Sequence, residues 1–297
     1  MHSARSRRLL ALSLASLFAV AALRGQAPAV AAPAATATAA PAAKLGSKVF
    51  LWDSYVVKPT AVGTRRDVAD LPTATFAKFE SHISTLNAGN MSHAPHIHPQ
   101  EEFIILKEGT LEASINGKLE RVEAGSIMFF ASNDYHNVTN VGTTPATYLV
   151  FNLATAATQS VPKAGATAAA VPGKLVSTVF HWDKLEAKPT KTGARREIVN
   201  SPTSTLLGLE GHITTLKPGE APHAPHHHPD EELIIVKDGL MEVMIKGVTQ
   251  RGGPGSIFFY GSNDEHGMKN VGGTEATYYV FRTITEATPK ESPAKAD

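Results

Sequence analysis

The sequence contains no cysteine, which excludes disulfide bonds, thiolate catalysis and cysteine-ligated zinc or iron–sulfur centres. A chain without thiols also suits export into an oxidising compartment. The chain also has almost no net charge, because it contains 28 Lys and Arg and 27 Asp and Glu. Several of the positive charges fall near the chain ends, so the body is not a basic nucleic-acid binder. We find no helical periodicity of useful length and no DNA-binding helix pair.

The N-terminus has the pattern of an export signal. Three arginines among the first eight residues form a positive segment, and residues 9–23 are an unbroken apolar or small run. That run is shorter than the about 20 residues that a membrane span needs. Ala29-Val30-Ala31 offers a small-x-small cleavage site. We therefore predict a cleaved signal peptide at residues 1–31, a periplasmic or secreted mature protein, and no stable membrane span after cleavage. An uncleaved anchor is the alternative.

The body of the chain is a tandem repeat. Phe50 and Trp52 recur as Phe180 and Trp182, and every matched pair lies 130 positions apart. About half of the positions between residues 45 and 153 match their partner, which indicates a duplication. With 42% hydrophobic residues, 297 residues leave room for two packed domains. We predict an Ala/Pro linker at 32–44, a first domain at 45–154, a linker at 155–174, a second domain at 175–284 and a flexible tail at 285–297.

Within each repeat the pattern favours β-structure. A short apolar run, Phe103-Ile104-Ile105-Leu106, ends before the turn residue Gly109. Apolar and polar residues then alternate up to an Asn116-Gly117 turn, as in a hairpin with one buried face. Many short strands between Gly, Pro and Asn turns indicate a sandwich or a barrel.

The strongest chemical signal lies at residues 96–102. His96 and His98 are two apart, so in a strand they project to the same side, and Glu102 follows. His136 comes after the next hairpin, and an antiparallel sheet can fold it back beside the other two histidines. Three imidazoles and a carboxylate suit a divalent transition metal such as Mn, Fe, Ni or Zn and disfavour Mg and Ca. A six-coordinate ion would keep two positions open, whereas zinc can be closed at four.

These residues and the glycines around them resemble the two sequence motifs of the cupin superfamily, first His96-x-His98-x₃-Glu102-x₆-Gly109 and then His136-x₃-Asn140. Both repeats match, although the usual proline two before the second motif's glycine is Glu123 in one and Gly253 in the other. The resemblance implies a bicupin, an all-β chain with two tandem double-stranded β-helix (jelly-roll) barrels and up to one metal per barrel. It assigns the ligands to His96, His98, Glu102 and His136, and to His226, His228, Glu232 and His266.

Further histidines repeat around the motif. His93 and His223 lie three positions before the first ligand and are candidates to orient a ligand or to meet substrate at the barrel mouth. A role as ordinary loop residues is the alternative. For His82 and His212 we expect a buried, hydrogen-bonded structural role. His227 should face away from the metal.

Charged and aromatic residues also repeat. Glu101 and Glu231 alternate with the ligand carboxylates, so we expect them to face outward. The pairs Arg65-Arg66 and Arg195-Arg196 are interpreted as part of a solvated N-terminal arm, with binding of an anion as the alternative. Trp52 and Trp182 are expected to fasten that arm to a barrel or to the other domain.

Fold does not determine function, so two classes of function remain open. The first is a metal-dependent enzyme, dioxygenase-like or using the metal as a Lewis acid, that acts on a small oxygen-rich substrate. Oxalate-type bicupins belong to this class, but the lid carboxylate that such chemistry needs is not assignable. The second is a non-catalytic binding or storage protein with a structural metal. The partner is a small molecule in either case. Because bicupins resemble a cupin dimer fused into one chain, we expect the two barrels to pack about a pseudo-twofold axis. Whether the chain also forms an oligomer stays open.

Overall fold

The structure is a computed structural model that describes residues 43–160 and 172–290. Residues 42–297 belong to one compact unit. The predicted signal peptide lies outside the described residues, as do most of the first linker, the middle of the second linker and the end of the tail. None of the helices in the described ranges is long and apolar enough to cross a membrane.

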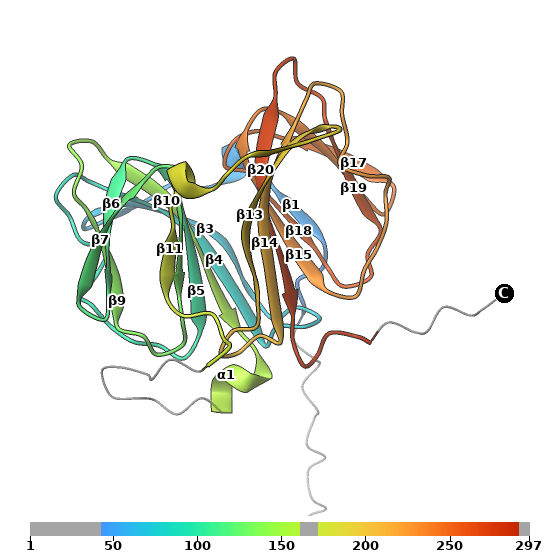
Figure 1. Ribbon diagram of the computed structural model, residues 1–297. Coiled ribbons are helices and arrows are strands. Elements are labelled where there is room, and N and C mark those ends of the chain that lie inside the picture. The colour runs from blue at the N-terminus through green and yellow to red at the C-terminus, as the bar shows by residue number, and fades with distance from the viewer. Residues whose placement is uncertain (1–42, 161–171, 291–297) are drawn as a thin grey trace, which may run out of the picture. The chain divides into compact units, whose positions relative to one another are not determined.

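The two repeats contain the same series of strands (Figure 1). The first consists of β1 (Lys48–Phe50), η1 (Trp52–Ser54), β2 (Lys58–Thr60), β3 (Gly63–Leu71), β4 (Lys78–Leu86), β5 (Glu101–Glu108), β6 (Thr110–Ile115), β7 (Lys118–Glu123), β8 (Ile127–Phe130), β9 (His136–Asn140) and β10 (Ala146–Ala154), followed by the short helix α1 (Ala156–Ser160). The second consists of β11 (Thr178–Phe180), η2 (Trp182–Lys184), β12 (Lys188–Thr190), β13 (Gly193–Ser201), β14 (Gly208–Leu216), β15 (Glu231–Asp238), β16 (Met241–Ile245), β17 (Val248–Gly252), β18 (Ile257–Tyr260), β19 (His266–Asn270) and β20 (Ala276–Ile284).

Each barrel is made of a large and a small antiparallel sheet. The large sheets have the strand orders β11-β8-β5-β10-β4-β3-β2 and β1-β18-β15-β20-β14-β13-β12. The small sheets are β7-β6-β9 and β17-β16-β19. The prediction of an all-β chain with two tandem jelly-roll barrels is confirmed.

The two repeats exchange their N-terminal strands. β1 belongs to the first repeat but pairs with β18 of the second, with Val49 opposite Phe258. Likewise β11 of the second repeat pairs with β8 of the first, with Val179 opposite Met128. In Figure 1 the yellow-green β11 accordingly lies among the green strands of the first repeat. Each barrel is therefore completed by a strand from the other repeat.

Three apolar clusters hold this arrangement together. Two of them fill the barrel interiors, for example around Leu106 and Val236. The third is shared, because the outer faces of the two large sheets pack on each other through pairs such as Phe79–Phe259 and Phe103–Phe281, with ring centroids 5.4 and 5.3 Å apart. β5 is thus buried on both faces, which explains its continuous apolar run.

The exchanged arms are fastened by their tryptophans, as predicted. Trp52 lies against Gly255 of the second repeat, and its backbone N–H donates to the Ser256 hydroxyl. Trp182 makes the matching contacts with Gly125 and Ser126. Because both glycines have a positive φ and meet an indole within about 3 Å of where a Cβ would stand, a side chain is excluded there.

One polar contact between the repeats has no counterpart in the other half. The His181 ring and the Glu120 carboxylate lie 2.7 Å apart, whereas Leu51 and Gln250 occupy the corresponding positions. The hydrogen bond with His181 lowers the pKa of Glu120 below its usual 4.5. The pKa of Glu120 is thus lower in the folded than in the unfolded chain. The pair therefore stabilises the fold at pH values above the unfolded-chain pKa, and this stabilisation is lost as the pH falls through the folded-state pKa.

We therefore expect Glu120→Gln to lower the free energy of unfolding by at most about 1 kcal/mol near pH 5.5, where the Glu120 carboxyl is ionised, and by less near pH 3. Urea denaturation at the two pH values measures this, with Gln250→Glu as the control that should change little. An equal effect of Glu120→Gln at both pH values would contradict the assignment.

Candidate metal centres

The first cluster of histidines is brought together by the backbone. His96 and His136 form an isolated antiparallel bridge, with mutual N–H···O=C distances of 3.1 and 3.0 Å. His136 begins β9, whereas His96 and His98 lie in the segment before β5. The expectation that both sit in one strand was therefore wrong, since β5 starts only at Glu101. The rings still converge because the bridge fixes His96 beside His136.

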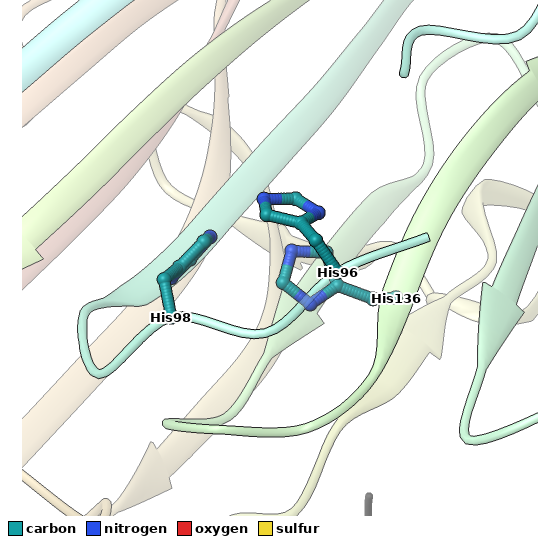
Figure 2. Close-up of side chains that lie close together, drawn as sticks. All are labelled: His96, His98 and His136. Atoms are coloured by element: carbon teal, nitrogen blue, oxygen red, sulfur yellow. The ribbon is translucent and has the colours of Figure 1, made fainter. Parts of the chain in front are cut away.

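The three rings surround one common space (Figure 2). One nitrogen from each of His96, His98 and His136 lies within 4.8 Å of the others. The Nδ1 atoms of His98 and His136 are bound to the carbonyls of Gln100 and Asp134, at 2.9 and 2.8 Å. These bonds fix the ring orientations and leave Nε2 to face the common space.

Glu102 completes the cluster, because its two oxygens lie 3.6 Å from His98 Nε2 and 3.8 Å from His136 Nε2. Burial, the largest influence, raises the pKa of Glu102, but His98 and His136 outweigh it and hold that pKa below its usual value. The carboxylate is therefore ionised. Burial and the neighbouring histidines lower the pKa of His96 to about 4, so this ring is neutral and able to bind a metal.

The second barrel repeats this geometry with one addition. His226, His228 and His266 lie within 4.8 Å of one another, and Glu232 Oε2 is 2.8 Å from His228 Nε2. His228 also has a carboxylate on its other side, since its Nδ1 lies 3.3 Å from Asp230 Oδ1. Although burial lowers it, these two carboxylates raise the pKa of His228 to about 9.

Asp230 is in turn held by Arg282 through two hydrogen bonds of 2.6 and 2.8 Å. Gln100 and Asn152 stand at these two positions in the first barrel. The second centre therefore carries an ionic chain, Arg282–Asp230–His228, that the first centre lacks.

The donor sets fit a metal ion. The Nε2 atoms of His136 and His266 are buried and have no hydrogen-bond partner, and the same holds for Nδ1 of His96 and His226. A buried nitrogen without a partner costs free energy unless something binds it. Three imidazole nitrogens beside one carboxylate are the ligands that a divalent transition metal prefers.

Each cluster lies at a cavity: all three histidines of the first cluster line one cavity, and His226 and His266 of the second line the other. The cavities of the first and second barrel measure about 400 and 360 Å³. His93 and His223 line them from exposed positions, and their rings stand 4.2 Å from those of His96 and His226. Both predicted mouth residues therefore contact a candidate ligand from the solvent side. His227 is exposed, as expected.

The wall of the first cavity contains a charged residue that the sequence motifs do not single out, Glu80. Glu80 accepts hydrogen bonds from Arg65, His82 and Asn152, each at 2.8 Å, and all four line the first cavity. His82 is hydrogen-bonded, as predicted, but it faces the cavity. The spacing of Glu80 and His82 on β4 is the signal that could have placed both on the inner face.

The two arginines of each pair lie in different environments, because neighbouring residues on a strand project to opposite faces. Arg65 reaches the first cavity, whereas the guanidinium carbon of its neighbour Arg66 stands 4.8 Å from the Trp52 ring centroid. Arg195 and Arg196 repeat this division. The interpretation of both arginines as part of a solvated arm was therefore wrong.

Glu101 and Glu231 face out of their barrels, as predicted, but they are buried rather than exposed to solvent. Their exposed fractions are 0% and 1%. They do leave the barrel interior, as alternation requires, but that outer face is covered by the other repeat. Burial raises the pKa of both carboxyls, while hydrogen bonds from threonines act in the opposite direction.

Tyr260 and Phe130 differ by one hydroxyl at equivalent positions. Each ring stacks on a candidate ligand, His266 or His136, at 4.2 and 4.4 Å. The Tyr260 hydroxyl is buried and has no hydrogen-bond partner, which is unfavourable. We expect Tyr260→Phe to raise the free energy of unfolding of the metal-free protein by about 1 kcal/mol, and Phe130→Tyr to lower it by a similar amount. Urea denaturation measures both, and a loss of stability in Tyr260→Phe would mean that the hydroxyl has a partner in solution.

Comparison with known proteins agrees with this architecture. A cupin-domain family model matches residues 82–152 and 212–282. AerE from Microcystis aeruginosa has a similar structure, with a TM-score of 0.60 and 14% identity over 80% of this chain and 98% of that one. The Lactobacillus farciminis oxalate decarboxylase in its formate complex gives a TM-score of 0.61 and 15% identity over 82% and 88% of the two chains. A mutant of the Bacillus subtilis oxalate decarboxylase gives 0.60 and 14% over 82% and 79%.

A search of curated proteins gives no match. At these identities the structural likenesses show the fold alone. The two domain matches and the two barrels together place the chain in the cupin superfamily, and its tandem arrangement makes it a bicupin.

Proposed function

We propose that this chain is a metal-dependent bicupin enzyme that acts on a small, oxygen-rich, chelating substrate. The observation that carries the proposal is that His136 and His266, each with a buried and unpartnered Nε2, line cavities of several hundred Å³ beside the other candidate ligands. His96, His98, Glu102 and His136 would hold one ion, and His226, His228, Glu232 and His266 the other. A bound divalent ion would supply Lewis-acid or redox chemistry at its open positions.

Manganese and a small carboxylate are the first ion and substrate class to test. A Bacillus subtilis oxalate decarboxylase of the same fold has Mn(II) centres, and a second oxalate decarboxylase was solved with formate. In this chain Arg65 and Arg195 each place a guanidinium in a cavity wall. There it is paired with Glu80 or Glu210 and would share its N–H donors with a substrate carboxylate.

The test supplies ¹³C-oxalate and a panel of 2-oxo acids and dicarboxylates to the manganese-loaded protein, and follows products by NMR and oxygen by electrode. Decarboxylation of oxalate would give one formate and one carbon dioxide per substrate. The control is the double variant His98→Ala/His228→Ala, which should lose turnover. Equal turnover in that variant would refute the proposal.

A non-catalytic binding protein is the second candidate. It is favoured by Glu80, whose oxygens already accept from three donors and are not free to take a proton. Saturable binding of an acid that perturbs bound manganese, with no turnover across the panel, would support this candidate.

We also propose export of the mature chain, on the basis of the N-terminal sequence. Mass spectrometry of the protein from the periplasm or the medium should show an N-terminus after Ala31. A full-length chain retained in the cytoplasm would contradict it.

A further inference from the structure

Each candidate metal centre has two ligands whose neighbours are held by the opposite repeat. The first contact is made by Glu101, which directly precedes the candidate ligand Glu102 on β5. Its carboxylate accepts hydrogen bonds from the hydroxyls of Thr203 and Thr205 and, at 2.8 Å, from the backbone N–H of Ser204. All three donors belong to the second repeat, in the turn between β13 and β14.

The same contact recurs in the opposite direction. Glu231, which precedes Glu232, accepts from Thr73 and Thr75 at 2.6 and 2.7 Å and from the Ala74 N–H at 3.0 Å. Both turns are further fixed from the opposite repeat, since Thr155 donates to the Thr205 carbonyl and Thr285 to the Thr75 carbonyl, each at 3.1 Å. The predicted linker and tail thus begin with buried residues.

The second contact concerns the histidine at the start of β9. His136 Nδ1 is bound to the carbonyl of Asp134, and the Asp134 carboxylate accepts from Ser177 of the second repeat at 2.5 Å. Ser177 also accepts from the Ala131 N–H at 2.7 Å, so it connects both ends of this turn.

The second barrel has the matching contact. Ser47 of the first repeat donates to the Asp264 carboxylate at 2.6 Å and accepts from the Gly261 N–H at 2.7 Å. The Asp264 carbonyl is bound to His266 Nδ1 at 2.8 Å. Two of the four candidate ligands in each barrel are therefore flanked by contacts from the other half of the chain.

We propose that Thr203, Thr205 and Ser177 position the ligands of the first centre, and that Thr73, Thr75 and Ser47 position those of the second, so that each repeat sets the metal affinity of the other. This inference rests on the proposed metal binding. It differs from a merely structural role, which would weaken both centres together. Groups that orient metal ligands typically change affinity 10- to 100-fold.

The test uses the full chain with one centre left intact. His228→Ala keeps the first centre, and His98→Ala keeps the second. Into each we introduce either the triple variant Thr203→Val/Thr205→Val/Ser177→Ala or its symmetry mate Thr73→Val/Thr75→Val/Ser47→Ala. The two triples remove equivalent hydrogen bonds, so they are matched for general destabilisation, which thermal unfolding checks.

We expect the first triple to weaken Mn(II) binding at the first centre at least tenfold, and its mate to change it less than twofold; at the second centre the pattern reverses. Thr203→Ser/Thr205→Ser keeps the hydroxyls and should retain affinity, even where a triple folds poorly. Weakening of both centres by both triples, or of neither, would overturn the proposal.

Histidine-ring ¹H–¹⁵N spectra of the metal-free protein give a second readout. The first triple should shift the ring signals of His98 and His136 but not those of His228 and His266. If each triple shifts only the ring signals of the opposite repeat's centre, but the unaltered protein binds no manganese, the positioning role stands and the metal proposal is refuted. If manganese binds normally but each triple shifts the signals of both centres or of its own repeat's centre, the metal proposal stands and the positioning role is refuted.

Discussion

The variants His98→Ala and His228→Ala should each hold one manganese ion per chain where the unaltered protein holds two, and the double variant should hold none. Each histidine supplies one of four donors, and its Nδ1 is already bound to a backbone carbonyl at 2.9 or 2.8 Å. Nε2 is therefore the one atom of each ring that is available to a metal, and substitution by alanine removes it. We expect the affinity of the altered centre to fall by more than about 100-fold, because even the loss of an orienting partner costs 10- to 100-fold.

Mass spectrometry of metal content after dialysis measures the effect. His227→Ala is the matched control, since this exposed histidine lies between two candidate ligands and should be dispensable. Two ions in His98→Ala, or one ion in His227→Ala, would contradict the assignment of the centres. Loss of both ions in a single variant would show that the centres fill only together.

The second large effect concerns the exchanged strands. A chain of residues 43–165 alone should fail to give a soluble monomer, and residues 166–290 likewise. The first barrel would lose β11, and the outer face of its large sheet would expose rings such as Phe79 and Phe103, which are 2% and 3% exposed in the whole chain. Each large apolar side chain stabilises by about 1.5–3 kcal/mol on burial, so exposing this cluster removes more than a typical domain's net stability.

Produced together, the two fragments should associate one to one, because the contacts between them do not depend on a continuous backbone. Affinity purification through a tag on one fragment, followed by light scattering, measures this. Phe103→Asp in the first fragment is the control and should abolish the complex. A single fragment that is monomeric and unfolds cooperatively would show that the exchange is not required.

The ligand positions could be predicted because the chemistry depends on a short motif. His96, His98, Glu102 and His136 all lie at one cavity, although the strand assumed for His98 is not there. The wrong strand assignment did not affect the predicted ligands, because the bridge between His96 and His136 brings the rings together although His96 lies outside a strand.

The contacts between repeats could not be predicted, for a physical reason. Alternation assigns Glu101 to the outer face of β5, but it does not say what covers that face. A duplicated sequence is equally compatible with strands that pair within a repeat or between repeats, because Val49 and Val179 have the same local pattern. Glu101 and Glu231 illustrate this, because their outward direction could be predicted and their burial could not.

The exchange of β1 and β11 makes the two barrels unequal during synthesis. The backbone N–H of Trp182 meets its partner Ser126 56 positions away, so the first barrel has all of its strands soon after residue 180 has been made. Trp52 must wait for Ser256, 204 positions further along. The arm that contains β1 and Trp52 is thus synthesised before every other strand, yet it can pair only after β18 has been made. Completion of the second barrel therefore depends on the last part of the chain to be synthesised.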